Sequence, residues 1–208
     1  SAASDVYKRQ VLYPAAAVEV YHNWTLVHDD IIDQDAFRRN VPTSHYSIAG
    51  MMKKTYRLEE AEAARQGRDF AMLCGDVQQA WANDLLLRAE DYGVAPSVVL
   101  AMSRRMQHLG NRLLVSGEAL DMELALREIE SISPDEVLEM IRLKTGALLQ
   151  LAAELGGMTA LNSADCQRIE LKRIGDFAMA AGVAFQLRDD WLGIFGEEVK
   201  LGKAIGGD

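Results

Sequence analysis

The stretch TLVHDDIIDQDAFRRN (residues 25–40) places four aspartates within seven residues and follows them with two arginines. Like charges four residues apart on a helix repel each other by roughly a few tenths of a kcal/mol. A chain of net charge −9 gains nothing from concentrating its negative charge further. His22, Asp29 and Asp33 share one helix face, with Thr25 close by. The pattern therefore indicates that a cation is expected at this face.

A second acidic pair follows in AFQLRDDWLG (residues 184–193), where Gln186, Asp189 and Gly193 share a helix face and Asp190 is adjacent. Two helices that each carry an aspartate pair among large apolar residues form one carboxylate-lined cavity if they face each other. Aspartate oxygens suit hard cations, and Mg²⁺ bridges carboxylates to phosphates while it keeps several waters. The two pairs predict a magnesium cluster that holds a polyphosphate.

One lysine interrupts an apolar helix row. Lys144 falls in a gap of the row Val137, Ile141, Leu148, Leu151 and Leu155. Lysine on a core-facing row is uncommon unless it is paired or functional. A snorkelling side chain at the end of a bundle is the structural alternative. A cavity that holds diphosphate would explain the lysine, and Thr145 would add a hydroxyl donor.

Three further cations could contact phosphate oxygens. The guanidinium groups of Arg38 and Arg39 are suited to bind them as forks. Lys203 lies in the glycine-rich segment LGKAIGGD (residues 201–208), whose backbone can approach a phosphate closely. An exposed loop lysine is commonplace, so Lys203 carries little weight alone.

The bulk composition bounds the class of protein. The 208 residues are 49% hydrophobic and 25% charged, which fits one globular domain with a core. The net charge of −9 argues against a nucleic-acid partner and against attraction to anionic membranes. No apolar run approaches the roughly 18 residues that a membrane span needs. Cys74 and Cys166 match no metal spacing and are expected to be reduced, buried thiols of a cytosolic protein.

Nearly every segment favours helix, because Ala, Leu, Glu, Arg and Met dominate and only four prolines occur. The capping box SPDE (residues 133–136) predicts a helix start. The expected helices are 14–33, 68–91, 96–130, 133–157 and 162–191, with an irregular stretch at 37–43 and a loop-like tail. Residues 1–10 lack apolar periodicity and are interpreted as a non-native leader. The domain would then cover residues 11–208, truncated at both ends.

Together these stretches resemble the trans-isoprenyl diphosphate synthases, the polyprenyl synthetase family, of the geranylgeranyl and farnesyl diphosphate synthase type. HDDIIDQDAFRRN resembles their first aspartate-rich motif, DDxxD followed by RRG. Four further stretches resemble family motifs and follow in the family's order: LVSGEALD, RLKTGALL, AFQLRDDWLG and LGKAIGGD. Asn40 stands where glycine is usual, Ala204 where proline is frequent, and Gly193 replaces the last aspartate of the second motif. The basic segment and the helices that precede this region in the family are absent from the sequence.

The resemblance implies an all-α fold, the isoprenoid synthase type of helical bundle around a deep central cavity. It implies that an allylic diphosphate is joined head to tail to isopentenyl diphosphate, with release of pyrophosphate. Three Mg²⁺ ions would be held by Asp29, Asp30, Asp33, Asp189 and Asp190. The allylic diphosphate would be held by Arg38, Lys144, Thr145, Gln186 and Lys203, and isopentenyl diphosphate by His22 and Arg39. The catalytic set would be Asp29, Asp33, Lys144, Gln186 and Asp189.

The likeness also implies a cytoplasmic homodimer and a short-chain product. In the resembled family, bulky residues before the first motif form the floor of the product pocket. Trp24 lies five residues before Asp29, and Tyr21 lies eight before it. Ordinary core packing is the alternative reading of both aromatics.

Three other readings are weighed against this one. A class I terpene cyclase shares the fold, but in NDLLLRAED (residues 83–91) Leu87 and Asp91 stand where its second metal motif needs Ser or Thr and Glu. A ferritin-like di-metal bundle needs two ExxH motifs, and EVYH (residues 19–22) is the only one. A non-catalytic subunit of a heteromeric synthase would not need the metal-binding acids, which this chain retains.

Overall fold

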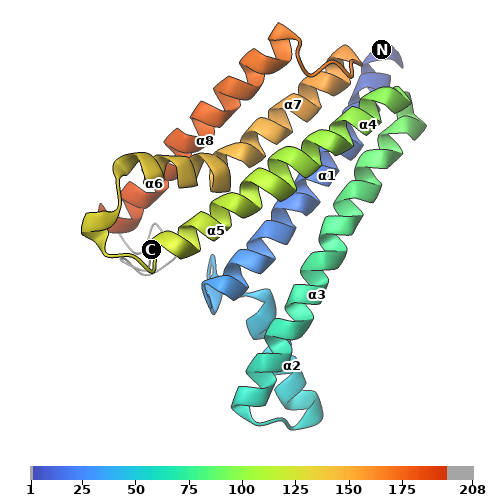
Figure 1. Ribbon diagram of the computed structural model, residues 1–208. Helices are drawn as coiled ribbons and strands as arrows, with labels where there is room; N and C mark the ends of the chain where they lie inside the picture. Colours follow the sequence, from blue (N-terminus) through green and yellow to red (C-terminus); the bar gives the residue numbers. More distant parts are fainter. Residues whose placement is uncertain (1, 196–208) are drawn as a thin grey trace. The chain divides into compact units, whose positions relative to one another are not determined.

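The computed structural model describes residues 2–195, with the side chains of residues 9–193 and 195 (Figure 1). Eight α-helices dominate this part, which confirms the all-α prediction. Their bounds are α1 Ala2–Ile32, α2 Ser44–Tyr56, α3 Glu60–Leu87, α4 Pro96–Arg105, α5 Val115–Leu124, α6 Pro134–Ile141, α7 Ala147–Leu161 and α8 Ile169–Phe195. Two 3₁₀ segments (Arg88–Tyr92 and Ile129–Ser131) and two π-helical segments (Met106–Leu114 and Arg142–Gly146) connect or extend them. A hairpin of β1 (Phe37–Arg38) and β2 (Val41–Pro42) follows α1.

The described chain forms two compact units, which are considered separately. Unit 1 joins residues 2–18 to residues 83–190, and unit 2 joins residues 19–82 to residues 191–195. Helices α1, α3 and α8 each contribute to both units. The first acidic cluster therefore belongs to unit 2, whereas Lys144 and the second acidic pair belong to unit 1.

Unit 1 is built around a long helical rod. Helix α4, the π segment 106–114 and α5 follow one another without a break, and α7 packs along them. Figure 1 shows α8 beside α7 in this unit. The fully buried side chains at the centre are Met102, Met106, Leu109, Leu151, Leu155 and Met158. These long, flexible side chains fill the space between the rod and α7.

A buried ion pair joins the rod to α7. Arg105 donates from Nε to Glu154 Oε2 at 2.5 Å and from Nη2 to Glu154 Oε1 at 2.7 Å. Gln150 also donates to Glu154 Oε1, at 2.8 Å. The Glu154 side chain is only 7% exposed. A carboxylate is tolerated at this depth because the guanidinium fork and the amide satisfy its oxygens.

Unit 2 turns sharply after α1 through a two-residue hairpin. Arg38 pairs with Val41, so Arg39 and Asn40 form the turn. Both turn residues have positive φ, 52° and 62°, which is the requirement of a type I′ turn. Asparagine tolerates this left-handed region better than most residues, so Asn40 can occupy a turn position that favours glycine. The hairpin fixes where the Arg38 side chain emerges.

The capping box at the start of α6 is confirmed. The Glu136 backbone N–H donates to Ser133 Oγ, and the Ser133 backbone N–H donates to Glu136 Oε2 at 2.9 Å. Arg127 donates to the other carboxylate oxygen at 2.8 Å. These hydrogen bonds, that from Arg127 first, lower the pKa of Glu136 to about 2.

Several predicted helix boundaries were wrong. Helix α1 begins at Ala2 and continues through Pro14, which is buried. Helix α2 was not predicted, because its 13 residues show little apolar periodicity. Helix α3 begins at Glu60, eight residues before the predicted start. The predicted helix 96–130 ends as α5 at Leu124.

The connection after α7 also differs from the prediction. Helix α7 continues through its two glycines to Leu161, where Asn162 forms a left-handed C-cap with φ 43°. The first residue of NSAD thus caps the end of α7 instead of opening a new helix, and α8 begins only at Ile169. The cysteines were expected to be buried, yet Cys74 is exposed and Cys166 is partly exposed. Cys74 lies on a side of α3 where residues 70, 73 and 77 are also exposed, and Cys166 lies in the connection between α7 and α8.

Glu154→Ala should lower the free energy of unfolding by about 3 kcal/mol, because it leaves the Arg105 guanidinium unpaired in a mostly buried setting. We take the lower end of the range for buried pairs since the Arg105 side chain is 22% exposed. Urea unfolding followed by circular dichroism measures the change. Glu123→Ala, at an exposed position of α5, is the control and should change stability by less than about 0.5 kcal/mol. Equal effects of the two substitutions would contradict the role assigned to the pair.

Candidate functional site

The first acidic cluster lies at the end of α1 in unit 2, and Arg38 compensates part of its negative charge. Arg38 donates from Nη2 to Asp29 Oδ2 and from Nε to Asp30 Oδ1, both at 2.7 Å. A guanidinium of the protein thus contacts two of the acids for which a cation was predicted. The β-hairpin makes the contact by turning the chain back so that Arg38 reaches the last turn of the helix.

Burial strengthens this charge cluster. The Asp30 side chain is 7% exposed, whereas that of Asp29 is 21% exposed. Burial raises the pKa of Asp30, although the hydrogen bond and charge of Arg38 act in the opposite direction. Burial alone would lower the pKa of Arg38, but the two carboxylates outweigh it and raise that pKa. The pair is held together because each group would be costly to bury without the other.

The other residues predicted for this cluster are more open. Asp33 and Arg39 are exposed, just beyond α1 and at the hairpin turn. The backbone N–H of Asp33 donates to Asp29 O at 2.9 Å, so Asp33 still continues the helical path. His22 is half-buried, and burial lowers the pKa of its imidazole. Its Nδ1 is buried and has no hydrogen-bond partner among the described residues.

The second group of predicted residues meets in unit 1. The π-helical segment 142–146 carries Lys144 and Thr145, and α8 carries Gln186, Asp189 and Asp190. Thr145 Oγ1 donates to Gln186 Oε1 at 3.0 Å, and Gln186 Nε2 donates to Asp190 Oδ1 at 2.8 Å. A hydrogen-bonded chain thus connects the lysine-bearing segment to the acidic end of α8.

The close approach of these two segments depends on glycine. A Cβ atom at Gly182 of α8 would lie 2.9 Å from the Gly146 Cα atom, nearer than side-chain carbons normally come. The two backbones can therefore touch because Gly182 lacks a side chain, and a Cβ at Gly146 would in turn lie 2.3 Å from Met179 Sδ of α8. This contact brings Thr145 within reach of Gln186. Asp189 is exposed beside this chain.

Lys144 is paired within the protein, by residues to which we assigned no role from the sequence. Its Nζ lies 2.6 Å from Asp121 Oδ2 and 3.0 Å from Glu118 Oε2, both on α5. The sequence signal was present in LVSGEALD, where two acids three residues apart share a helix face. It carried no assignment because helical spacing does not reveal which element faces α5.

Each unit offers a pair of carboxylates on which Mg²⁺ could bind. No group of three His, Cys, Asp or Glu side chains suited to a metal occurs among the residues that the structure describes. Such a group is not required, since Mg²⁺ is usually held by one or two carboxylates together with waters and substrate phosphates. The donor chemistry of Asp29 with Asp30, and of Asp189 with Asp190, fits that ion. Lys203 lies outside the described residues.

Comparison with known proteins places these residues in a family context. The family model described as polyprenyl synthetase matches residues 2–208. The chain is 35% identical over 201 residues to a short chain isoprenyl diphosphate synthase of Methanocaldococcus jannaschii, covering 96% of this chain and 52% of that protein. It is 34% identical over 202 residues to a farnesyl diphosphate synthase of Geobacillus stearothermophilus, covering 93% and 58%. The chain spans about half the length of the curated relatives it matches.

A solved structure shows the same fold. Geranylgeranyl pyrophosphate synthase from Corynebacterium glutamicum, in complex with isoprenyl diphosphate and magnesium, matches with a TM-score of 0.82 at 27% identity. The match covers 96% of this chain and 53% of that one. No helix within residues 2–195 has the length and apolar character needed to cross a membrane.

Arg38→Ala should lower the free energy of unfolding by about 2 kcal/mol, because it leaves Asp30 buried without its cation. This is below the usual range for a buried pair since Arg38 is 35% exposed. Asp30→Asn should remove most of that loss, so the two substitutions should couple by at least about 1 kcal/mol in a double-mutant cycle. Urea unfolding without added metal measures all four proteins. Arg39→Ala, at the exposed neighbouring turn position, is the control, and additive effects would refute the pairing.

Proposed function

The chain belongs to the polyprenyl synthetase family. We propose that the protein is a prenyltransferase that joins an allylic diphosphate to isopentenyl diphosphate, head to tail, with release of pyrophosphate. The observation that carries the proposal is the hydrogen-bonded chain Thr145–Gln186–Asp190, which groups a lysine-bearing turn with an acidic helix end. Polar side chains of this kind suit a magnesium diphosphate.

We propose the following division of roles. Asp29, Asp30 and Asp33 in unit 2, and Asp189 and Asp190 in unit 1, would hold Mg²⁺, with three ions in all. When bound, Mg²⁺ would neutralise diphosphate charge and make pyrophosphate a better leaving group. The allylic diphosphate would be held by Arg38, Lys144, Thr145, Gln186 and Lys203, and isopentenyl diphosphate by His22 and Arg39.

Arg38 would change partners when metal and substrate bind. In the structure its guanidinium neutralises Asp29 and Asp30. Metal binding to these carboxylates would supply that positive charge instead, and the fork of Arg38 could then bind phosphate oxygens. The same residue would thus stabilise the cluster before substrate arrives and the substrate afterwards.

The chemistry proposed for the bound substrates balances without a further reactant. The allylic C–O bond breaks, its electron pair leaves with pyrophosphate, and a carbocation remains. The double bond of isopentenyl diphosphate forms the new C–C bond, and a proton is then lost to pyrophosphate. The fixed side chains would favour this step by binding the leaving diphosphate and by excluding water from the cation.

We also propose a cytoplasmic homodimer. Helix α3 exposes an apolar row at helical spacing, Phe70, Leu73, Val77 and Trp81, of which Leu73 and Val77 are 60% and 67% exposed. Such a row is a natural surface for a second copy of the chain. The two unpaired cysteines are in keeping with a reducing compartment.

The other readings considered from the sequence gain no support. The relatives named above are diphosphate synthases, not cyclases or di-metal carboxylate proteins. The predicted metal-binding acids are present in both clusters, which argues against a non-catalytic subunit.

The proposed reaction is tested by pyrophosphate release from the whole protein, supplied with isopentenyl diphosphate, an allylic diphosphate and Mg²⁺. Asp29→Ala and Asp189→Ala should each reduce kcat by at least about a hundredfold, because substrate charge loses part of its compensation. Glu123→Ala is the control and should retain full activity. Wild-type turnover by either aspartate variant at saturating Mg²⁺ would show that the metal assignment is wrong.

A short-chain product is expected if Trp24 closes the pocket. Trp24 is partly buried and lies edge-on to the fully buried Tyr21, with ring centroids 4.8 Å apart. Trp24→Ala removes a large side chain and leaves space, so the whole protein should make longer products at a comparable rate. Chromatographic sizing of the products measures the shift. Tyr56→Ala, at an exposed aromatic of unit 2, is the control, and an unchanged product length with a folded Trp24 variant would place the floor elsewhere.

A further inference from the structure

We propose that Glu118 and Asp121 are positioning residues that fix the Lys144 ammonium before a diphosphate binds. The inference rests on the proposed function, because it takes Lys144 as a diphosphate ligand. Both carboxylates lie on α5 and reach the same nitrogen, at 3.0 Å and 2.6 Å. The Lys144 side chain is 23% exposed, so it is partly removed from water without being sealed off from it.

The backbone of Lys144 is held as firmly as its ammonium. A Cβ atom at Gly117 would lie 2.2 Å from Lys144 N and 2.7 Å from Lys144 Cα. Helix α5 therefore touches the lysine-bearing turn directly, and one helix fixes both ends of the lysine. This turn is π-helical, and single π turns inside α-helices often occur at functional sites.

Two opposing effects follow from this arrangement. A long lysine loses rotamer entropy when it binds a ligand, and holding it in place beforehand removes that cost. The carboxylates carry two negative charges against one positive charge, however, and they repel an incoming anion. If the carboxylates only tether α5 to the turn, they affect diphosphate binding through their repulsion alone. If they also position Lys144, they affect binding both through repulsion and through the rotamer entropy that the lysine no longer loses.

The neighbouring contacts indicate what the positioning achieves. Thr145 follows Lys144 in the same turn and is hydrogen-bonded to Gln186, which is bonded to Asp190. The turn is thus held by α5 on one side and by α8 on the other. Holding Lys144 in one orientation sets its ammonium relative to the other polar groups proposed to bind diphosphate.

Substitution of Asp121 by two different residues separates position from charge. Asp121→Asn and Asp121→Ala both remove one negative charge, but only asparagine keeps an oxygen that can accept from Lys144 Nζ. We expect the asparagine variant to bind inorganic pyrophosphate at saturating Mg²⁺ within about threefold of the unchanged chain. The alanine variant should bind about tenfold more weakly. Isothermal titration calorimetry on the 208-residue chain measures both affinities. The positioning role would be overturned if Asp121→Ala bound pyrophosphate as tightly as Asp121→Asn, or more tightly.

Two further comparisons keep the test decisive. If Asp121→Ala fails to fold, Glu118→Gln and Glu118→Ala form an equivalent pair with the same expected order. Lys144→Ala separates this proposal from the function on which it rests. Weaker binding by Lys144→Ala together with unchanged binding by Asp121→Ala would overturn the positioning role alone. Unchanged binding by Lys144→Ala would overturn both that role and the assignment of Lys144 as a ligand.

Discussion

Charge compensation among partly buried carboxylates is the constraint on which the rest of this structure depends. A carboxylate that leaves water must be paired or protonated. Such pairings in the described chain include Asp29 and Asp30 with Arg38, Glu118 and Asp121 with Lys144, and Glu154 with Arg105. The first two involve cations that we propose to bind diphosphate. Each of these two cations is therefore already paired with carboxylates of the protein.

This pre-existing pairing shapes how ligands can bind. A metal bound at Asp29 and Asp30, as proposed, would compete with the Arg38 guanidinium, and a diphosphate bound at Lys144 would compete with two carboxylates. In the proposed function, a metal would neutralise the acids in place of Arg38, and phosphate oxygens would pair with the cation so released.

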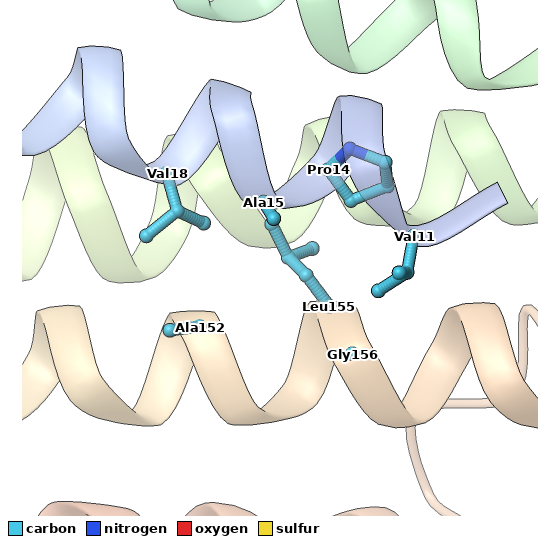
Figure 2. Close-up of a pocket in the computed structure, with 7 residues that line it drawn as sticks. All are labelled: Val11, Pro14, Ala15, Val18, Ala152, Leu155 and Gly156. Carbon is cyan, nitrogen blue, oxygen red and sulfur yellow. The ribbon is translucent and has the colours of Figure 1, made fainter. Parts of the chain in front are cut away.

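Close backbone contacts complement the charges. In unit 1, α5 reaches the lysine-bearing turn at Gly117, and α8 reaches the same turn at Gly146 and Gly182. The packed rod and α7 provide a rigid base for this turn, while an apolar hollow of about 200 Å³ remains elsewhere in the unit. Val11, Pro14, Ala15 and Val18 of α1 line it opposite Ala152, Leu155 and Gly156 of α7 (Figure 2). It lacks charged groups and is distinct in chemistry from the candidate site.

The sequence by itself determined the helical class, the two acidic clusters and the unusual lysine, because helical periodicity and charge spacing are local properties. It also located the capping box of α6, whose partners are three residues apart. Only the tertiary structure showed that Arg38 neutralises Asp29 and Asp30, because the type I′ turn that returns the chain has no glycine to mark it. The pairing of Lys144 with Glu118 and Asp121 was likewise decided in three dimensions. These residues are more than twenty positions apart in sequence, and they meet because Gly117 lets two helix backbones touch.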